Sequence, residues 1–448
     1  MTTPVSTGTA RSQPWHARRN TELALLVLAA VIVAGAYVLA SLGRSSSIPA
    51  DIVPFLVVVL ALLVAAHVAT RRLAPDADGI LLPLAGLLNG LGYVFIARLD
   101  EDLAGLQATW TAVGIGAYVL TLVVVRRARD LETYRYTFAL VGIALLLLPL
   151  APVIGREING ARIWASIGPV NFQPGEFAKI LLAVFFASYL VERRELLGMM
   201  SLRIGPLHLP EVKYLGPVLV AWGASVVVMV AEKDLGSSLL FFALFVVMLW
   251  VATERATYLA IGGTLFAIGA YVSWTQFAHV QQRIEIWLDP WTDPKGDGFQ
   301  VVESWFSLAW GGITGTGPGL GNPGQIPAAE TDFIFSVIGE ELGLLGATLI
   351  LAAFLVMIGS GLRIASRAEP AFEKLLAVGL TTLLGVQAFI IIAGVTRLLP
   401  LTGVTLPFIS YGGSSLVANY VLLAILMRIS DDNSLRRAAR LEREGAQP

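Results

Sequence analysis

Several apolar runs, each of roughly 18 residues or more, constrain the fold more than any other feature of this sequence. A run of that length is long enough to cross about 30 Å of hydrocarbon as a helix. Only 14% of the 448 residues are charged, whereas a soluble domain has about a quarter. The runs are too long and too uniform for barrel strands, and backbone groups inside a membrane must bond to each other. The sequence therefore predicts an all-α polytopic membrane protein.

We expect twelve transmembrane helices. The least distinct are the two runs on either side of Glu232-Lys233-Asp234, which predict either a helical hairpin or one broken element. The expected spans cover residues 22–42, 51–70, 79–98, 108–125, 136–154, 174–191, 214–231, 235–252, 256–274, 331–362, 373–396 and 411–428.

The distribution of lysine and arginine predicts the orientation of these spans. With the N-terminus in the cytoplasm, 22 of the 31 basic residues fall on the cytoplasmic side. Eight fall on the opposite side, and Lys179 lies within a span. Twelve spans also place the C-terminus in the cytoplasm. We therefore expect cytoplasmic tails at residues 1–21 and 431–448, and a long extracytoplasmic loop at residues 275–330.

Composition also excludes several kinds of site. The chain has no cysteine, so disulfides, thiolate metal sites and cysteine nucleophiles are excluded. The four histidines are scattered and match no metal-ligand spacing. Loops rich in acidic residues can still hold a hard cation through oxygen ligands.

The long outer loop is rich in Gly, Pro, Asp and aromatic residues. Asp289 and Asp293 each precede a proline, which pushes both aspartates out of helical geometry. Such a rigid turn can present a carboxylate as a general base to a hydroxyl group. Equally, Asp-Pro is ordinary turn chemistry. Gln300 follows closely and can contact a polar ligand. The glycine-rich stretch 311–324 matches no P-loop pattern, so a compact turn-rich loop is favoured over a phosphate cradle.

Carboxylates at or inside the expected spans are functional candidates, because a charge in the membrane is costly. Asp332 lies near the start of the span 331–362, so it either caps the helix or serves the site. Glu340 and Glu341 lie deeper, and we expect each to pair with a buried donor. Glu176 and Lys179 are three residues apart on one helix face, either as a structural ion pair or as a diphosphate holder.

The segment 397–415 combines two prolines with Gly412-Gly413, which indicates a re-entrant loop facing a cavity. Arg397 lies beside this loop as an isolated outer cation. It either snorkels to lipid headgroups or binds an anionic group of a ligand.

Six motifs in this order make the chain recognisable: NGARIW, QPGEFAK, EKDLGSS, WLDPWTDPKGDGFQ, TDFIFSVIGEELG and LPLTGVTLPFISYGGSS. Over residues 79–430 the chain resembles the SEDS family (shape, elongation, division and sporulation proteins), and its elongation type in actinobacteria more than its division type. Family members commonly have ten spans. The resemblance therefore implies a core at residues 71–430 and an additional N-terminal pair at residues 22–70.

The resemblance also implies roles for single residues. The essential loop aspartate of the family falls on Asp293, which would act as the general base or hold a divalent cation such as Mg²⁺ or Mn²⁺. Ile163 stands where an arginine is usual in the family, and Arg162 lies one place earlier. The residues expected to bind substrate are Glu176, Lys179, Arg162, Trp164, Gln300, Asp332, Arg397 and Ser410.

The implied function is a peptidoglycan glycosyltransferase that polymerises lipid II on the outer face of the plasma membrane during elongation. The implied partners are a class B penicillin-binding protein and other elongation machinery, and no nucleic acid is expected. Two other classes stay open. A lipid II flippase would need polar groups near the midplane, for which Glu340 and Glu341 are the best argument. A non-enzymatic scaffold would only activate the penicillin-binding partner.

Overall fold

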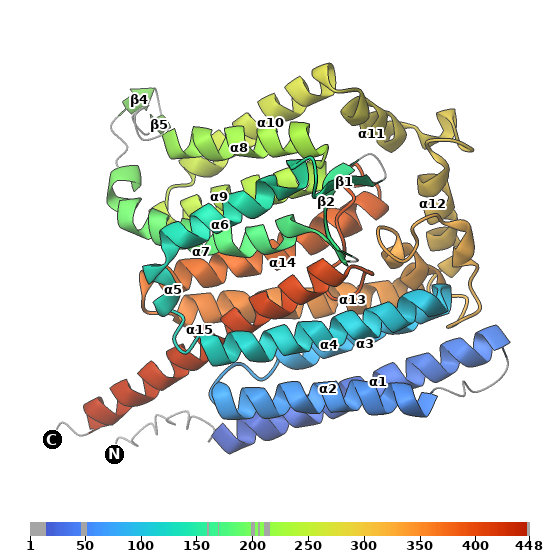
Figure 1. Cartoon of the computed structure of the whole chain (residues 1–448), viewed down its shortest axis with the longest axis horizontal. Coiled ribbons are helices and arrows are strands. Elements are labelled where there is room, and N and C mark those ends of the chain that lie inside the picture. The colour runs from blue at the N-terminus through green and yellow to red at the C-terminus, as the bar shows by residue number, and fades with distance from the viewer. Residues whose placement is uncertain are drawn as a thin grey trace, which may run out of the picture.

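The computed structural model describes residues 15–45, 52–158, 161–168, 170–198, 202–204, 207–209 and 216–445. Long helices run roughly side by side through the molecule, and the connections gather at its two ends (Figure 1). The prediction of an all-α polytopic membrane protein is confirmed, although two small sheets lie at the ends of the bundle. Residues 1–14 of the expected N-terminal tail and residues 446–448 lie outside the described residues.

The expected additional N-terminal pair corresponds to α1 (Trp15–Ser45) and α2 (Ile52–Leu73). Both lie along one side of the bundle, against α3 (Leu81–Leu99) and α4 (Glu101–Val124). A buried pair of side chains joins α1 to α2, because Nδ1 of His67 lies 2.7 Å from Oε1 of Glu22. The hydroxyl of Thr70 lies 2.7 Å from that of Tyr118, which ties α2 to α4.

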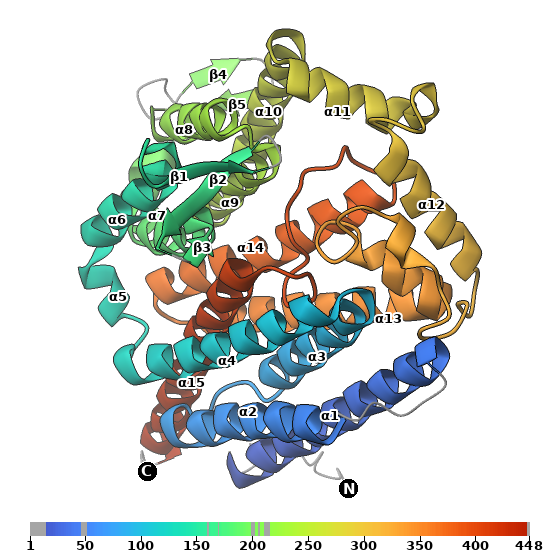
Figure 2. The same ribbon diagram turned by 45° about the vertical axis from the view of Figure 1, so that its right-hand side comes forward.

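The remaining helices form the core, with the last helices α13, α14 and α15 near its centre (Figure 2). α8 (Gly216–Glu232) and α9 (Leu235–Thr253) are separated by only two residues and pack together, so of the two alternatives for Glu232-Lys233-Asp234 the hairpin is the one present. Asp234 accepts hydrogen bonds from the amides of Gly236 and Ser237 and so begins α9. The core helices are α5 (Asp130–Thr133), α6 (Arg135–Leu147), α7 (Pro174–Gly198), α8 (Gly216–Glu232), α9 (Leu235–Thr253), α10 (Thr257–Gln276), α13 (Ile334–Arg367), α14 (Ala371–Val395) and α15 (Gly413–Gly445).

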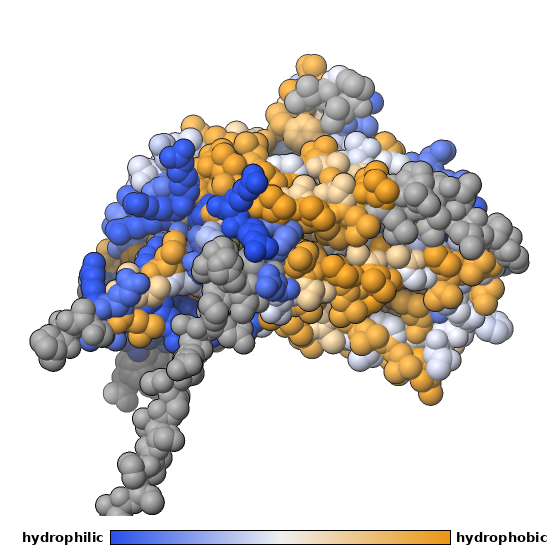
Figure 3. All heavy atoms as spheres, turned by 90° about the horizontal axis from the view of Figure 1, so that it is seen from below, coloured by the Kyte–Doolittle hydropathy of each residue, from blue (hydrophilic) through white to orange (hydrophobic). Residues whose placement is uncertain are grey.

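Every one of the twelve expected spans overlaps a helix. Within the described residues, nine helices are long and apolar enough to cross a membrane, and the helix over Arg135–Leu150 is apolar but shorter. The number of spans therefore stays a prediction. Viewed from the side of α1 and α2, apolar side chains form a broad belt, and hydrophilic side chains gather at the end where α15 emerges (Figure 3). This pattern fits a bundle embedded in a bilayer.

The expected long loop has helices of its own. It contains α11 (Ala278–Leu288) and α12 (Phe299–Gly311), with the short helices η3 (Pro290–Thr292) and η4 (Pro323–Gln325). α11 and α12 lie at one end of the bundle, on the opposite side of the α14–α15 connection from a three-stranded sheet (Figure 2).

No strand was predicted from the sequence. The three-stranded antiparallel sheet consists of β1 (Gly155–Ile158), β2 (Ala161–Ile167) and β3 (Val170–Phe172), after the short helix η1 (Leu148–Leu150). A second hairpin at the other end pairs β4 (Leu202–Ile204) with β5 (Leu207–Leu209). Strands of three to seven residues are too short to show a clear alternation of polar and apolar residues.

Candidate active site

Two Asp-Pro turns shape the loop between α11 and α12. Asp289 accepts hydrogen bonds from the amide of Trp291 and the hydroxyl of Thr292, both at 3.1 Å. The carboxylate of Asp293 is exposed and accepts from the amides of Gly296 at 3.1 Å and Asp297 at 3.3 Å. Both aspartates therefore close turns. For Asp293, the same bonds fix the direction of an exposed carboxylate, as a general base requires.

A pocket of about 240 Å³, here named the polar pocket, lies beside this turn. It brings together three predicted substrate-binding residues that are far apart in sequence: Gln300, Asp332 and Arg397. Asp297 also lines it, so Asp293 is linked to its rim through the hydrogen bond from the Asp297 amide. The structure thus places four of the predicted residues in or next to one pocket.

Arg397 turns toward the protein. Its guanidinium group lies 4.8 Å from the ring centre of Trp305 and donates from Nη2 to the Leu288 carbonyl at 2.7 Å. The indole of Trp287 donates to the Arg397 carbonyl at 3.0 Å. Arg397 therefore joins the segment after α14 to both α11 and α12. The snorkelling alternative did not predict these contacts within the protein.

Asp332 lies two residues before α13 begins, and α13 has no side-chain cap. The cap alternative is therefore wrong. Burial raises the pKa of Asp332 to about 6, and the nearby Glu330 and Asp234 act in the same direction, while Arg283 opposes them. Burial also raises the pKa of Asp234. Arg283 is thus a cation whose charge acts on both the half-buried Asp332 and the buried Asp234.

A buried polar network lies at the start of α7. Nζ of Lys179 lies 2.6 Å from Oε2 of Glu176 and donates to Oε1 of Gln387, also at 2.6 Å. The amide group of Gln387 in turn donates to the Thr405 carbonyl at 2.9 Å. The predicted Glu176–Lys179 pair is therefore present. It is held by α14 and the α14–α15 connection, and neither residue lines the polar pocket.

Glu340 and Glu341 organise the glycine-rich stretch 311–324. Glu340 accepts from the hydroxyl of Ser307 and the amide of Asn322, both at 2.7 Å. Glu341 accepts from Nε of Arg98 at 3.0 Å and from the amide of Gly319 at 2.8 Å. Each glutamate has a buried donor, as predicted, and these bonds satisfy the carboxylates without any transported ligand.

The same stretch packs on a kink in α13. Gly343 has a φ of 66°, and a Cβ atom there would lie 2.2 Å from the amide nitrogen of Gly315. The freed backbone groups of α13 bond to the loop, since the amide of Leu344 donates to the Gly312 carbonyl at 2.9 Å. Only glycine permits this conformation and this close approach.

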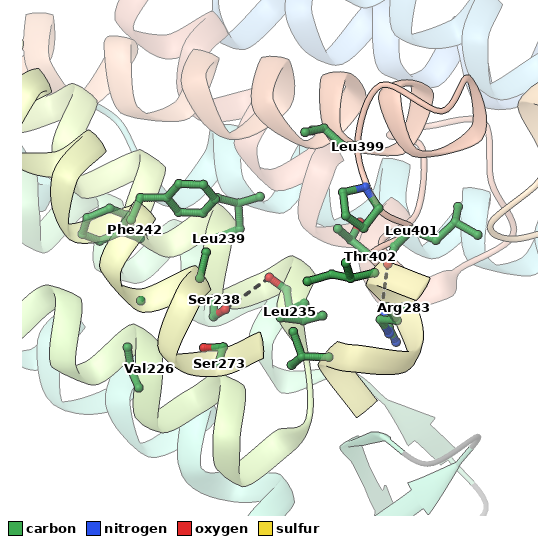
Figure 4. A pocket seen from close by; sticks show the side chains of 16 residues that line it. Val226, Leu235, Ser238, Leu239, Phe242, Ser273, Arg283, Leu399, Leu401 and Thr402 are labelled. Carbon is green, nitrogen blue, oxygen red and sulfur yellow. Dashed lines mark hydrogen bonds between the residues drawn. The ribbon is translucent and has the colours of Figure 1, made fainter. Parts of the chain in front are cut away.

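An apolar groove of about 190 Å³ lies between α8, α9, α10 and α11 (Figure 4). Its walls are mostly aliphatic and aromatic, with Leu239 and Phe242 pointing along it. Arg283 lies at one end and donates to the Leu401 carbonyl at 2.9 Å. Arg283, Leu399 and Leu401 line both the apolar groove and the polar pocket, so the two cavities adjoin at this arginine.

The other predicted binding residues lie elsewhere. Arg162 and Trp164 share one face of β2, with Arg156 of β1 beside Trp164, and both arginines are exposed. This face does not line the polar pocket. Ser410 is buried, donates to the Thr331 carbonyl at 2.6 Å and accepts from the Leu406 amide at 2.9 Å. Its hydroxyl thus fastens the α14–α15 connection to the segment before α13.

Arg283 and Gln387 are the residues that the sequence analysis missed. Gln387 is a buried amide within a long apolar span, and such polar residues are candidates in their own right. Arg283 is one of only eight basic residues on the expected outer side, and this scarcity is the sequence signal that marks it as a candidate.

No set of protein ligands for the expected divalent cation is evident among the described residues. Among the described residues, no three Asp, Glu, His or Cys side chains are grouped so that they could hold a metal ion. Both oxygens of the Asp293 carboxylate accept hydrogen bonds from backbone amides. The described side chains therefore provide no ready-made cage for a cation at Asp293.

The fold and these cavities define a multi-pass membrane protein with a structured polar site at one end of its helices. A model of the family described as cell cycle protein, of FtsW, RodA and SpoVE type, matches residues 93–435. The chain belongs to this family, and the resemblance inferred from its motifs is confirmed.

Named relatives extend the match over nearly the whole chain. The chain is 46% identical over 441 residues to the peptidoglycan glycosyltransferase RodA of Mycobacterium tuberculosis, covering 96% of this chain and 94% of that protein. It is 45% identical over 440 residues to the RodA of Mycobacterium leprae, with the same coverage. A probable peptidoglycan glycosyltransferase FtsW of Geobacter sulfurreducens is 35% identical over 76% of this chain and 86% of that protein.

Solved structures share the fold. One is a peptidoglycan synthase complex that coordinates polymerization and crosslinking, with a TM-score of 0.64 and 29% identity over 80% of this chain and 98% of that one. Another is the rod shape determining protein RodA of Thermus thermophilus, with a TM-score of 0.57 and 27% identity over 80% and 97%.

Proposed function

We propose that this protein is a peptidoglycan glycosyltransferase that polymerises lipid II during cell elongation. The mycobacterial relatives bear this activity in their names, and the similarity to them covers nearly the whole of both chains. The structural observation that carries the proposal is the meeting of the polar pocket and the apolar groove at Arg283. A saccharide joined to a polyprenyl chain by a diphosphate needs a polar pocket, a cation and an apolar groove next to one another.

The two cavities and the arginine between them define one orientation for a lipid-linked sugar substrate. The polyprenyl chain follows the apolar groove, where burial of its CH₂ groups is favourable. The diphosphate lies near Arg283 and Arg397, since arginine matches phosphate oxygens with paired N–H donors. The sugar occupies the polar pocket beside Gln300 and Asp332. Trp287 and Trp305 line the same pocket and offer aromatic faces to sugar rings.

Asp293 is the proposed general base. Its carboxylate takes the proton of the acceptor 4-hydroxyl as that oxygen attacks the anomeric carbon of the donor sugar. The bond from this carbon to the diphosphate oxygen breaks, and the electron pair leaves with the diphosphate. Charge that develops on the leaving group is stabilised by fixed cations, for which Arg283 and Arg397 are placed at the pocket. Asp293 ends protonated and returns its proton to water.

Lys179 has a separate role in this scheme. It is buried against Glu176 and Gln387 beneath the α14–α15 connection. We assign it to holding that connection, and with it Arg397, in a productive position. This replaces the simpler expectation that Lys179 contacts the diphosphate directly.

The proposed orientation rests on the distribution of lysine and arginine. With both termini in the cytoplasm, 22 of the 31 basic residues fall on the cytoplasmic side. α11 and α12 lie at the opposite end of the bundle from the end of α15 (Figure 1), so we propose that the candidate site is extracytoplasmic. A class B penicillin-binding protein is the proposed partner, because a related structure belongs to a complex that couples polymerization with crosslinking.

The flippase alternative loses its best argument. Glu340 and Glu341 were the carboxylates nearest the midplane, and both serve the glycine-rich stretch on the side of the active site. The scaffold alternative has no specific observation in its favour.

The test is polymerisation of purified lipid II by the full chain in proteoliposomes, with and without a class B penicillin-binding protein. Asp293→Asn and Asp289→Asn form a matched pair, because each aspartate accepts two hydrogen bonds in its turn. Asparagine keeps one acceptor oxygen, so both variants lose the charge and one turn contact, and they differ only in which carboxylate is removed. We expect polymer from the wild type and from Asp289→Asn, and none from Asp293→Asn. Equal polymer from all three would overturn Asp293 as the base. Translocation of labelled lipid II without polymer from any of them would identify a flippase.

A further inference from the structure

A third cavity lies between the additional helix α1 and the core, away from the site described above. Its volume is about 620 Å³, within the range of small-molecule sites. The walls come from the last residues of α1 and α3 and the first residues of α4. All three helices end or begin there on the side of the long loop. The cavity therefore lies at the level of lipid headgroups in the outer leaflet (Figure 1).

The lining of this cavity is half polar and half apolar. Ala40, Val94 and Ala104 are buried and give it apolar walls. The rings of Tyr37 and Tyr93 lie 6.4 Å apart between their centroids. Tyrosine at a span end is typical of the membrane interface, where one side of the ring is apolar and the other is wet.

Arg44 is the cation available to a ligand. Its Nη1 lies 3.1 Å from Oε1 of Glu101, and the two side chains are 48% and 80% exposed. Exposed pairs of this kind contribute only about 0–1 kcal/mol. Arg44 can therefore exchange Glu101 for a phosphate group, with which arginine forms stronger, paired hydrogen bonds.

The cavity is also connected to the long loop. Arg98 lines it, and Arg98 donates to Glu341 and, from Nη2 at 2.7 Å, to the Gly321 carbonyl. Ala40 lines it too, and a Cβ atom on Gly319 would lie 2.1 Å from the Ala40 carbonyl oxygen. The glycine-rich stretch thus rests directly on two walls of the cavity.

We propose that this cavity binds a phosphate-bearing amphiphile of the surrounding leaflet, with its phosphate at Arg44 and its chains along Ala40, Val94 and Ala104. The occupant steadies the end of α1 and, through Arg98 and Gly319, the glycine-rich stretch of the long loop. Two lipids share this chemistry, a glycerophospholipid and a polyprenyl phosphate. The site is independent of the glycosyl-transfer site, and it stands whether or not that proposal holds.

One pair of variants distinguishes lipid binding in this cavity from lipid contact elsewhere on the surface of the protein. Gly105 lines the cavity, and a Cβ atom there meets open space, so the side chain of Gly105→Leu begins without a clash and takes up part of the cavity. Gly116 lies on the same helix with equally open space around it, and it does not line the cavity. Gly116→Leu is therefore the matched control, and thermal unfolding of both checks that they fold.

The measurement is native mass spectrometry of the purified, delipidated full chain titrated with dioleoylphosphatidylglycerol, undecaprenyl phosphate or dioleoylglycerol. We expect a phosphate-bearing lipid to bind about tenfold more tightly than dioleoylglycerol, and Arg44→Gln to remove most of that difference. Gly105→Leu should abolish the tight binding, and Gly116→Leu should retain it. Comparing the binding of dioleoylphosphatidylglycerol with that of undecaprenyl phosphate identifies which lipid occupies the cavity. Equal binding of dioleoylglycerol, or wild-type binding by Arg44→Gln or Gly105→Leu, would overturn the proposal.

Discussion

The ammonium group of Lys179 lies 2.6 Å from a carboxylate oxygen of Glu176, and the lysine side chain is almost completely buried. Two charges withdrawn from water in this way are tolerated only when they are paired and fully hydrogen-bonded. Gln387 provides the second contact, because its Oε1 accepts a hydrogen bond from the same ammonium group at 2.6 Å. The pair therefore fixes three segments at once: the start of α7, the middle of α14 and, through Gln387, the connection that carries Arg397.

Replacing Lys179 with methionine tests this role. The variant leaves Glu176 without its cation, and breaking such a pair costs about 3 kcal/mol of stability. Because the α14–α15 connection loses its anchor, we expect lipid II polymerisation to fall at least about 100-fold. Lys374→Met, an exposed lysine at the opposite end of the bundle, should change neither quantity. The measurements are the thermal midpoint and the polymer yield, and full polymerisation by Lys179→Met would contradict the assignment.

The second prediction concerns Glu341, which holds the glycine-rich stretch through Arg98 and the Gly319 amide. Glu341→Gln keeps an acceptor but loses the charge, so the ion pair with Arg98 is lost and stability falls by about 2 kcal/mol. Hydrogen exchange at the amides of Gly317 and Gly319 should become faster. Glu157→Gln removes a half-exposed outer pair with Lys233 and serves as the control. Unchanged exchange in Glu341→Gln would show that the kink at Gly343 alone holds the stretch.

Much of the fold was visible in the sequence, because long apolar runs are almost sufficient to define spanning helices. The partners of polar residues were not visible. Arg98 and Glu341 are 243 residues apart, and nothing local to either indicates the other. Glu232-Lys233-Asp234, just before α9, was recognisable as a break between two apolar runs. Only the packing of α8 against α9 shows that this break forms a helical hairpin.

The candidate site was predicted in part. The motifs identified Gln300, Asp332 and Arg397, and the structure places them around one pocket. Arg162 and Trp164 come from an equally recognisable motif, yet they lie on an exposed sheet face. The difference lies in the strands: β1 to β3 direct this motif away from the pocket, and such short strands leave no periodic signal in the sequence.

The third prediction uses the pKa of Asp332, which lies outside the helix α13. Burial raises this pKa from 3.8 to about 6. The folded protein therefore binds the proton more tightly than the unfolded chain does. The stabilising contribution of this group is complete below pH 3.8 and is lost as the pH rises through about 6, a change of about 3 kcal/mol. Asp332→Asn removes this dependence, because asparagine stays neutral.

Comparing Asp332→Asn with the wild type isolates the effect of this carboxyl group on stability from the effects of all other titratable groups. The stability of Asp332→Asn relative to the wild type should increase between pH 4 and pH 7.5, as followed by the thermal midpoint across that range. A difference that is constant with pH would mean that the pKa of Asp332 is the same in the folded protein as in the unfolded chain.

The last prediction concerns Gly296, whose position depends on Asp293. A Cβ atom on Gly296 would lie 2.1 Å from Oδ2 of Asp293, so Gly296→Ala must push the carboxylate out of its turn. Since the turn is exposed, we expect stability to change by less than about 1 kcal/mol. A displaced general base transfers protons poorly, so polymerisation should fall by about 100-fold. Gly324→Ala adds the same methyl group to the same loop where nothing lies within 4 Å, and it should retain activity. If Gly296→Ala polymerises lipid II as well as Gly324→Ala does, the direction that the turn gives to Asp293 is irrelevant to catalysis.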